Sequence, residues 1–564
     1  MSRHMSRHKS RHPQVDRPTC TDMGEYMGFD RRLFLATATA SALPLLGCKA
    51  SADITGGFTG VAQARGHLLQ QPQTWPLPSL TRHTDVLIAG GGVAGLAAAR
   101  ALRLKGVEDF ALLELEDEAG GNARGGAVNG VPCPLGAHYL PVPGNNAPEV
   151  QNLLEELGLR TRQAGRWVMD ERHLCHSPQE RLFFNGAWQE GLLPLNGVGP
   201  QTLAQYQQFS DLVAQQQRQA RWTIPIRNQP LAQVQQALAA ITFEAFLNQH
   251  QLTDAHLRWY LNYCCRDDYG AGLATVSAWA GIHYFASRHG FAVPGREAVE
   301  REGLLTWPEG NAWLTRRLAA PLKERLHTGQ VVLRITHVKH GVEVDAFDTA
   351  TQTVVRWQAK RAIVALPIFV AARVVQNPPD WLTQAAGQMV YAPWLVANVH
   401  LRTALQDRPG APPSWDNVVY GDASTAPGLG YVDASHQNLQ PIPGATVLTY
   451  YQALGELGWS GRQMLLNTSW NSWRDAILAE LARPHPDLAA KVTRIDITRY
   501  GHAMAVPVPN VYGKTSLQPI YYMGKQLSNT YQSVPTFERL AFAHGDWAGY
   551  SVFEEAFTRG HWAG

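Results

Sequence analysis

The chain has 564 residues, of which 45% are apolar and 17% charged, and its formal net charge is +3 at pH 7. This length suits two domains, and the small charge excludes a protein that binds nucleic acid through a strongly basic surface. After residue 47, no stretch reaches the roughly 18 consecutive apolar residues of a membrane-spanning helix, so no internal span is expected.

The first 47 residues are predicted to be a targeting signal. Arg31 and Arg32 precede an apolar stretch that ends in Leu-Leu-Gly-Cys at residues 45–48, the pattern of a twin-arginine signal with a lipoprotein-like cleavage site. We expect recognition by the twin-arginine export machinery and residence on the periplasmic side of the membrane. Cys48 is the expected lipid anchor, with ordinary cleavage nearby as the alternative. Residues 1–47 hold seven Lys and Arg against four Asp and Glu, so the remaining chain is formally neutral.

A dinucleotide-binding βαβ unit is predicted over residues 85–114. An apolar strand leads into a glycine-rich turn and an alanine-rich helix, and a second apolar strand ends on Glu114. Gly90 suits the tight turn, Gly92 the approach of a pyrophosphate, and Gly95 close packing of the helix on the strand. The helix N-terminus offers free N–H groups to the phosphates, and Glu114 is placed to accept the ribose hydroxyls.

The residues that follow resemble the flavin-containing amine oxidase superfamily, which includes protoporphyrinogen oxidases and phytoene desaturase-like carotenoid desaturases. The resemblance rests on Gly120-Gly121 and Arg124, six to ten residues after the terminal acid. It implies bound FAD, with Gly120 and Gly121 continuing the phosphate and ribityl cradle. The family usually has arginine where Asn122 stands, so Arg124 is expected to make the phosphate contact alone.

Two further blocks support the resemblance. Residues 331–338 and 341–344 are predicted to be two strands joined by a tight turn. In relatives the backbone near Ile335 would meet the adenine. Residues 361–367 resemble the strand that returns to the nucleotide domain.

The C-terminal residues 540–560 resemble the closing motif of the family, a strand ending in Gly-Asp followed by a helix. Asp546 would bind the ribityl or phosphate part of FAD. The helix, expected to begin near Gly549, would direct its N–H groups toward the flavin and stabilise the negative charge of its reduced form.

Candidate catalytic residues are fewer. Amine oxidases often carry a lysine shortly after a strand ending in Leu-Pro, but alanine stands at that position after Leu366-Pro367 here. Residues 500–507 resemble a segment that crosses the substrate side of the flavin. His502 is therefore the best candidate for an acid/base or substrate-orienting role, with a structural histidine as the alternative. His138 has weaker support. The paired carboxylates in residues 264–270 could meet a cationic substrate or form a solvated turn.

The cysteines do not suggest a metal site, because no Cys-x-x-Cys or Cys/His cluster occurs. Whether Cys264 and Cys265 join a disulfide stays open. No cysteine lies near the C-terminal motif, so non-covalent FAD is expected.

The predicted fold class is α/β: a Rossmann-like FAD-binding domain interleaved with an α+β substrate domain, the two-domain architecture of amine oxidases. The chain is expected to begin with a signal (1–47) and a linker (48–82). Three segments of the FAD-binding domain (83–165, 301–375 and 491–564) then alternate with two segments of the substrate domain (166–300 and 376–490).

Three functions remain open from the sequence. The first is an FAD-dependent oxidoreductase that transfers hydride from a small amine or amino acid to the flavin. The second is a desaturase- or dehydrogenase-like flavoenzyme that acts on an apolar substrate with an acceptor other than oxygen. The third is a non-catalytic FAD-containing binding protein. In every case we expect a small-molecule ligand and no nucleic acid.

Overall fold

The computed structural model describes the chain from residue 54 onward, in segments. These are residues 54–70, 75–226, 231–294, 303–422, 425, 427–437, 444–511 and 534–564, with the backbone of 521–522 and 525–526. The predicted signal, with Arg31, Arg32 and Cys48, lies outside the described residues.

The first large sheet contains the predicted βαβ unit. Strands β2 and β3 run parallel, helix α3 connects them, and the long strand β15 lies parallel to β2 on the other side. Strand β24 pairs in parallel with the end of β15. The members are β2 (Leu80–Ala89), α3 (Val93–Leu104), β3 (Phe110–Leu113), β12 (Leu326–His327), β13 (Gln330–Val338), β14 (Gly341–Asp348), β15 (Thr353–Val364), β23 (Thr536–Phe537) and β24 (Leu540–Phe542). The parallel strands β2, β3, β15 and β24 therefore end at one edge of this sheet.

The second large sheet has the order β1-β20-β16-β19-β18-β17-β9-β10. Its members are β1 (Thr55–Thr59), β9 (Glu180–Phe184), β10 (Ala187–Glu190), β16 (Val390–Leu401), β17 (Asp416–Val419), β18 (Tyr431–Asp433), β19 (Thr446–Ala453) and β20 (Val492–Val506). Strand β16 is buried on both faces. Leu395 and Val399 pack against the helices α13 (Gly458–Asn467) and α14 (Trp470–Leu481), whereas Trp394 and Val396 face the opposite core.

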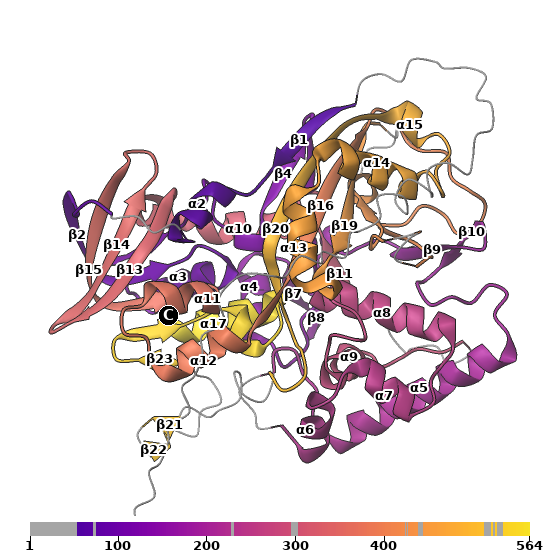
Figure 1. Ribbon diagram of the computed structural model, residues 1–564, viewed down its shortest axis with the longest axis horizontal. Helices are drawn as coiled ribbons and strands as arrows, with labels where there is room; N and C mark the ends of the chain where they lie inside the picture. The colour runs from indigo at the N-terminus through magenta and orange to yellow at the C-terminus, as the bar shows by residue number, and fades with distance from the viewer. Residues whose placement is uncertain are drawn as a thin grey trace, which may run out of the picture. The chain divides into compact units, whose positions relative to one another are not determined.

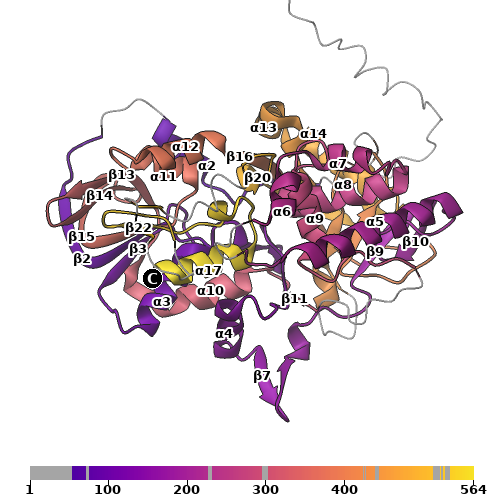
Figure 2. The ribbon, with the colours of Figure 1, turned by 90° about the horizontal axis from the view of Figure 1, so that it is seen from below.

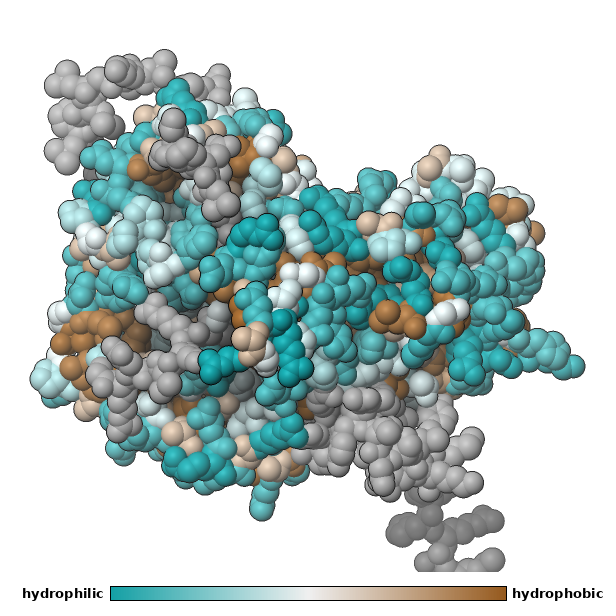
Figure 3. Space-filling view, turned by 180° about the vertical axis from the view of Figure 1, so that it is seen from behind, coloured by the Kyte–Doolittle hydropathy of each residue, from teal (hydrophilic) through white to brown (hydrophobic). Residues whose placement is uncertain are grey.

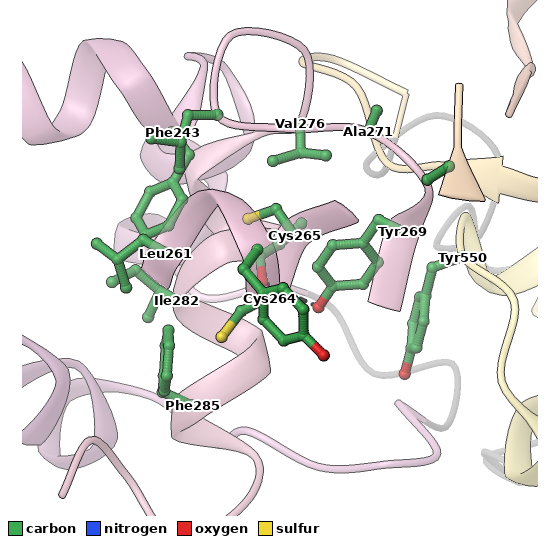
Figure 4. Close-up of a cluster of buried hydrophobic side chains, with 14 of the residues drawn as sticks. Phe243, Leu261, Cys264, Cys265, Tyr269, Ala271, Val276, Ile282, Phe285 and Tyr550 are labelled. Atoms are coloured by element: carbon green, nitrogen blue, oxygen red, sulfur yellow. Dashed lines mark hydrogen bonds between the residues drawn. The ribbon is translucent and has the colours of Figure 1, made fainter. Parts of the chain in front are cut away.

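A group of helices covers one side of the second sheet. Figure 2 shows them together at one end, away from β13, β14 and β15. They are α5 (Pro200–Gln219), α6 (Gln233–Ala239), α7 (Phe243–Gln249), α8 (Ala255–Tyr269) and α9 (Ala278–Ala286). Helix α9 is apolar almost all round because the other helices surround it. In Figure 4, Phe243, Leu261, Ile282 and Phe285 meet in this core, and Tyr550 of the C-terminal segment faces Tyr269 with ring centroids 6.1 Å apart.

The C-terminal segment returns to the first sheet. After β24 the chain forms a short 3-10 turn (Gly545–Ala548), and helix α17 (Phe553–Ala563) packs along α3. The contact is so close that a Cβ on Gly560 would lie 2.0 Å from the Ala94 carbonyl oxygen. The expected helix start near Gly549 is wrong: that residue has a left-handed conformation (φ 78°), and α17 begins at Phe553.

Smaller elements complete the architecture. They are the hairpins β4 (Gly125–Val128)–β5 (Val131–Pro134) and β7 (Arg160–Gln163)–β8 (Arg166–Met169), the pair β6 (Tyr139–Pro141)–β11 (Leu304–Thr306), and the helices α2 (Gln63–His67), α4 (Pro148–Glu156), α10 (Ala312–Ala319), α11 (Ile368–Val374), α12 (Asp380–Gln388) and α15 (Leu488–Lys491).

The predicted α/β class is confirmed, and the chain passes back and forth between the two large sheets (Figure 1). Two segments differ from the expected organisation. Residues 54–70, expected to belong to a linker, form β1, α2 and a 3-10 turn. Strand β20, which falls in the range expected for the last FAD-binding segment, pairs with β1 and β16 in the second sheet.

Among the described helices, none is long and apolar enough to cross a bilayer. The face shown in Figure 3 is mostly hydrophilic, with apolar residues in scattered patches.

Candidate active site

A cavity of about 600 Å³ opens where the parallel strands β2, β3, β15 and β24 of the first sheet end. The residues just after these strands line it: Gly90–Gly92, Leu113–Glu116, Ala365–Pro367 and His544–Asp546. Open α/β sheets bind their ligands at this edge, because connections that diverge on the two faces leave a crevice there. The cavity continues to residues of the second sheet and of α8.

The glycine-rich turn after β2 is shaped by backbone contacts. Gly90 has a φ of +105°, and a Cβ there would lie 2.4 Å from the Ala365 carbonyl oxygen. A Cβ on Gly95 would lie 1.8 Å from the Gly90 carbonyl oxygen, so the predicted close packing of helix and strand is present. Gly92 is the N-cap of α3 and makes no side-chain cap. The first N–H groups of α3 are thus left available to a ligand in the cavity.

Glu114 lies at the end of β3 beside this turn. Its carboxylate accepts hydrogen bonds from the Gly91 N–H and the Glu116 N–H, each 2.8 Å long. Burial raises the pKa of Glu114, while the two backbone N–H groups oppose that rise. The acid is therefore held rigidly at the cavity wall, as a ribose-binding residue requires.

The second glycine pair meets the first turn. Gly120 forms an isolated bridge with Gly92, and a Cβ on Gly121 would lie 3.1 Å from the Gly92 Cα. Gly120 and Gly121 both line the cavity together with Asn122, whose amide donates to the Ala503 carbonyl at 2.5 Å. The asparagine that replaces the usual arginine therefore connects this loop to the segment that carries His502.

Three of the predicted cofactor residues do not line the cavity. Gly95 lies behind the turn, where its role is helix packing. Arg124 is buried and donates to the carbonyl oxygens of Gly60 and Gly121, at 2.6 and 3.2 Å. Ile335 is a core residue of the first sheet, and the cavity wall is formed instead by residues 330–332 at the start of the same strand.

Asp546 is fully buried at the cavity edge and is held by three groups. Its Oδ2 accepts from the Ile368 N–H at 3.0 Å and from the Tyr391 hydroxyl at 2.7 Å, and its Oδ1 lies 3.1 Å from the His544 Nδ1. Burial alone would raise the pKa of Asp546, but His544 and these hydrogen bonds lower it. Asp546 therefore carries its negative charge at neutral pH.

His502 lies on β20 and lines the cavity. The ring stacks on Phe369 at 4.7 Å and meets Tyr391 edge-on at 6.0 Å. Desolvation, with Arg462 nearby, lowers the pKa of His502 to about 4. His502 is therefore a neutral imidazole at pH 7, suited to orienting a substrate through hydrogen bonds rather than to carrying charge.

Aromatic residues from the second sheet line the adjoining region of the cavity. His138 stacks on Tyr451 at 4.5 Å, and Trp394 lies beside them. The Tyr451 hydroxyl donates to the Gly136 carbonyl at 3.0 Å, and the Tyr500 hydroxyl donates to the Leu135 carbonyl at 2.9 Å. Burial lowers the pKa of His138 to about 3, so this ring is also neutral. The loop that carries His138 thus contributes to an apolar, aromatic wall.

Acidic residues of α8 lie at the same end. Asp268 is buried and pairs with Arg288 at 2.9 Å. Asp267 also lines the cavity, and within the described residues its carboxylate has no hydrogen-bonding partner. Burial and the neighbouring Asp268 raise the pKa of Asp267 to about 7. The interpretation of residues 264–270 as a solvated turn is wrong, because Asp267 and Asp268 belong to the last turn of a packed helix.

Another carboxyl lies near this pair, on strand β17. Burial, then Asp267 and Glu180, raise the pKa of Asp416 well above its usual value, so its neutral, protonated form is favoured at pH 7. Arg288 forms its ion pair with Asp268, and its charge also lowers the pKa of Asp267. Among the described residues, neither Asp267 nor Asp416 forms an ion pair of its own. The sequence shows that Asp267 and Asp268 are adjacent. Whether they face the cavity depends on how the helices α5–α9 pack. No sequence signal marked Asp416, Arg288 or residues 61–70, which also line or support the site.

The four cysteines in the described part of the chain take no part in this cavity. Cys133, Cys175, Cys264 and Cys265 are buried free thiols, and none of these four lines it. Cys264 and Cys265 are neighbours on α8 and do not form a disulfide in the structure.

The residues present fit a dinucleotide. Two glycine loops approach so closely that a side chain on Gly121 would fill the gap, the N-terminus of α3 has no cap, and a rigid acid flanks it. The adjoining part of the cavity, which is lined by aromatic residues, has room for a flat ring system. The fold and the site together define a dinucleotide-binding oxidoreductase with a substrate chamber between two sheets.

The comparisons with known proteins give the family. The model of the flavin-containing amine oxidoreductase family matches residues 93–561, so the chain belongs to that family and is an FAD-dependent oxidoreductase. A coproporphyrinogen III oxidase of Mycobacterium leprae is 42% identical over 97 residues, which span 17% of this chain and 20% of that protein. The matched stretch is therefore about a fifth of the length of that relative.

Solved structures agree on the fold. A putrescine oxidase bound to putrescine superposes with a TM-score of 0.60 and 18% identity, over 85% of this chain and 98% of the other. The cyclohexylamine oxidase of Brevibacterium oxydans IH-35A gives a TM-score of 0.58 and 18% identity, over 85% and 97%. At this identity the likeness describes the fold.

Proposed function

We propose that the protein oxidises a small amine that carries a second positive charge, such as a diamine or a basic amino acid. The observation that carries this proposal is the placement of Asp267 in the cavity that also contains the dinucleotide loops. Burial without an ion pair raises the pKa of Asp267, and a cation bound beside it would favour its charged carboxylate form. The similarity to amine oxidases supports the same class of substrate.

Each region of the cavity has a task in this reaction. When bound, FAD accepts the hydride from the carbon next to the amine nitrogen. Asp267 binds the distal ammonium group, and the aromatic wall around Tyr451 and Trp394 excludes water from the alkyl chain. His502, neutral at pH 7, orients the amine that is oxidised. The two glycine loops and the acid after β3 hold the pyrophosphate and ribose.

One observation favours the desaturase- or dehydrogenase-like alternative. Among the described residues that line the cavity there is no lysine, whereas many amine oxidases carry one beside the flavin. An apolar substrate would, however, give the Asp267 carboxyl group in the cavity no binding role. We therefore place the amine first and keep an apolar substrate with a non-oxygen acceptor as the second candidate.

Anaerobic reduction of the flavin separates these functions. The holoprotein is mixed without oxygen with a diamine, a monoamine of equal length, a basic amino acid and a polyene, and flavin bleaching is followed by absorbance. We expect the dicationic compounds to bleach the flavin at lower concentration than the monoamine. Bleaching by the polyene alone would establish the second candidate, and no bleaching by any of them would favour a non-catalytic FAD-binding protein.

We also propose that the protein is exported by the twin-arginine machinery and anchored at the periplasmic side of the membrane. The support is the sequence pattern of Arg31, Arg32 and Cys48. Export in the folded state suits a protein that must bind FAD in the cytoplasm before it leaves.

A further inference from the structure

Residues 54–70 form a folded segment that precedes the glycine-rich turn and lies outside the matched family region, which begins at residue 93. The segment contains β1, α2 and a 3-10 turn at Leu68–Gln70. In Figure 1, α2 lies between β1 and the strands of the first sheet. Gln63, Gly66 and His67 of α2 line the cavity.

The segment is bound on one side to the loop that follows Glu114. The Ala62 N–H donates to both carboxylate oxygens of Glu116, at 3.1 and 3.0 Å. The Arg65 guanidinium donates to the Leu115 carbonyl at 3.1 Å and to Asp117 at 2.7 Å. Every one of these partners lies within three residues of the acid predicted to bind the ribose.

On its other side the segment joins the second sheet. Strand β1 pairs in parallel with β20 over five residues, and the Arg499 guanidinium lies 3.6 Å from the centre of the Phe58 ring. Gly56 packs against β20 so closely that a Cβ would lie 1.8 Å from the Ile495 carbonyl oxygen. The segment therefore connects the dinucleotide-binding loops to the strand that carries His502.

Between these two attachments the segment forms a wall of the cavity. His67 is near enough to His502 to lower its pKa. The lining residues from this segment are Val61, Ala62, Gln63, Gly66, His67, Leu69 and Gln70. A ligand held by Glu114 and the glycine loops would have this wall on one side.

We propose that residues 54–70 belong to the FAD-binding site and limit the rate at which the cofactor leaves. The inference rests on FAD binding in this cavity and requires no particular substrate. A dinucleotide held between α3 and this wall dissociates only when the segment moves away from Glu116 and Asp117. Arg65, whose side chain contacts the protein rather than the cavity, is thus a positioning residue for cofactor retention.

The test compares three full-length holoprotein variants with the parent by the rise of free-flavin fluorescence after dilution. Arg65→Gln removes the bonds from α2 to the 115–117 loop. Gly60→Val disturbs the turn after β1, because a Cβ on Gly60 would lie 2.5 Å from the Thr498 hydroxyl. Arg316→Gln is the matched control: this arginine on α10 also pairs with a neighbouring acid, Glu118 at 2.7 Å, and a backbone carbonyl, Gly125 at 3.2 Å.

We expect Arg65→Gln to release FAD about five- to tenfold faster than the parent, the scale of losing an exposed ion pair with Asp117 and the hydrogen bond to the Leu115 carbonyl. Gly60→Val should release FAD faster still, and Arg316→Gln should stay within about twofold of the parent. Parent-like release by both segment variants would overturn the proposal, as would equal acceleration by Arg316→Gln. Because release is measured without substrate, a failure of the proposed amine oxidation leaves this test unaffected.

Discussion

At the residue scale, the environment of His502 changes what that histidine can do. Its low pKa means that the imidazole is neutral over the whole range from about pH 6 to about pH 9. A general base works best with a pKa near the working pH, and His502 does not meet that condition. Its position against Phe369 and Tyr391 suits a group that fixes the orientation of the amine.

His502→Ala should keep FAD but slow flavin reduction by the true substrate roughly 10²-fold, the usual effect of losing one positioned group. His502→Gln, which retains a hydrogen-bonding group, should recover some of that rate. Stopped-flow absorbance measures the reduction rate, and thermal melting serves as the control. If His502→Ala only lowers the melting temperature while the folded fraction is reduced at the parent rate, the histidine is structural.

Asp267 combines a binding role with a cost in stability. Its pKa of about 7 exceeds the roughly 3.9 of an unfolded aspartate, so the folded protein binds this proton more tightly. The free energy of unfolding therefore falls as the pH rises from about 4 to about 7, and the contribution is absent at higher pH. Asp267→Asn should then raise the melting temperature at pH 8 by about 2–4 °C.

The same variant should bind a dicationic amine less well. We expect Asp267→Asn to raise KM for a diamine about tenfold at pH 8 and to change KM for a monoamine little. In the parent, KM for the diamine should fall as the pH rises through about 7, because the carboxylate becomes charged. Asp268→Asn is the control: it leaves Arg288 without its partner and should lower stability. A parent-like KM for the diamine in Asp267→Asn would remove that residue from the site.

At the element scale, Gly92 and Gly95 of the same glycine-rich turn are needed for different reasons. Gly92 has an extended conformation (φ −71°), and a Cβ there would meet nothing closer than the Gly121 Cα at 3.9 Å. A Cβ on Gly95 would lie 1.8 Å from the Gly90 carbonyl oxygen. The first glycine leaves space for a ligand, and the second leaves space for the protein itself.

Gly92→Val should therefore fold with a parent-like circular dichroism spectrum but contain less than about a tenth of the parent FAD, since the side chain occupies the place of the pyrophosphate. Gly95→Ala should be poorly soluble or melt at a lower temperature even without FAD. Flavin absorbance per protein and melting of the FAD-free proteins distinguish the two. Full FAD content in Gly92→Val would show that the pyrophosphate does not approach this turn.

Local sequence patterns predicted those elements whose geometry depends on residues close together in the chain. The βαβ unit and the β13–β14 hairpin were predictable because turn glycines, strand patterns and helical spacing act over a few residues. The segment 54–70 was mistaken for a linker because β1 is stabilised by β20, more than 400 residues away. Asp267 was unclear for the same reason: tertiary packing of α8 decides which way it faces.

At the scale of the whole molecule, the chain crosses between its two sheets several times, and the cavity lies where those crossings meet. Glycine loops come from the first sheet, His502 and the aromatic wall from the second, and Asp267 from the helical group. Correct assembly of the site therefore requires the complete fold. This requirement fits the proposed export of the protein in its folded, FAD-loaded state.

The proposed twin-arginine signal can be tested by substitution. Changing Arg31 and Arg32 together to lysine should leave the FAD-loaded precursor in the cytoplasm, because the twin-arginine pair is the recognition feature of that pathway. Cys48→Ala should give an exported protein that is released from the membrane, since acyl chains on Cys48 would supply the attachment. Immunoblots of cytoplasmic, periplasmic and membrane fractions measure both effects, with FAD content as the control for folding. Unchanged membrane attachment of Cys48→Ala would exclude Cys48 as the anchor, and normal export of the double lysine variant would refute the signal.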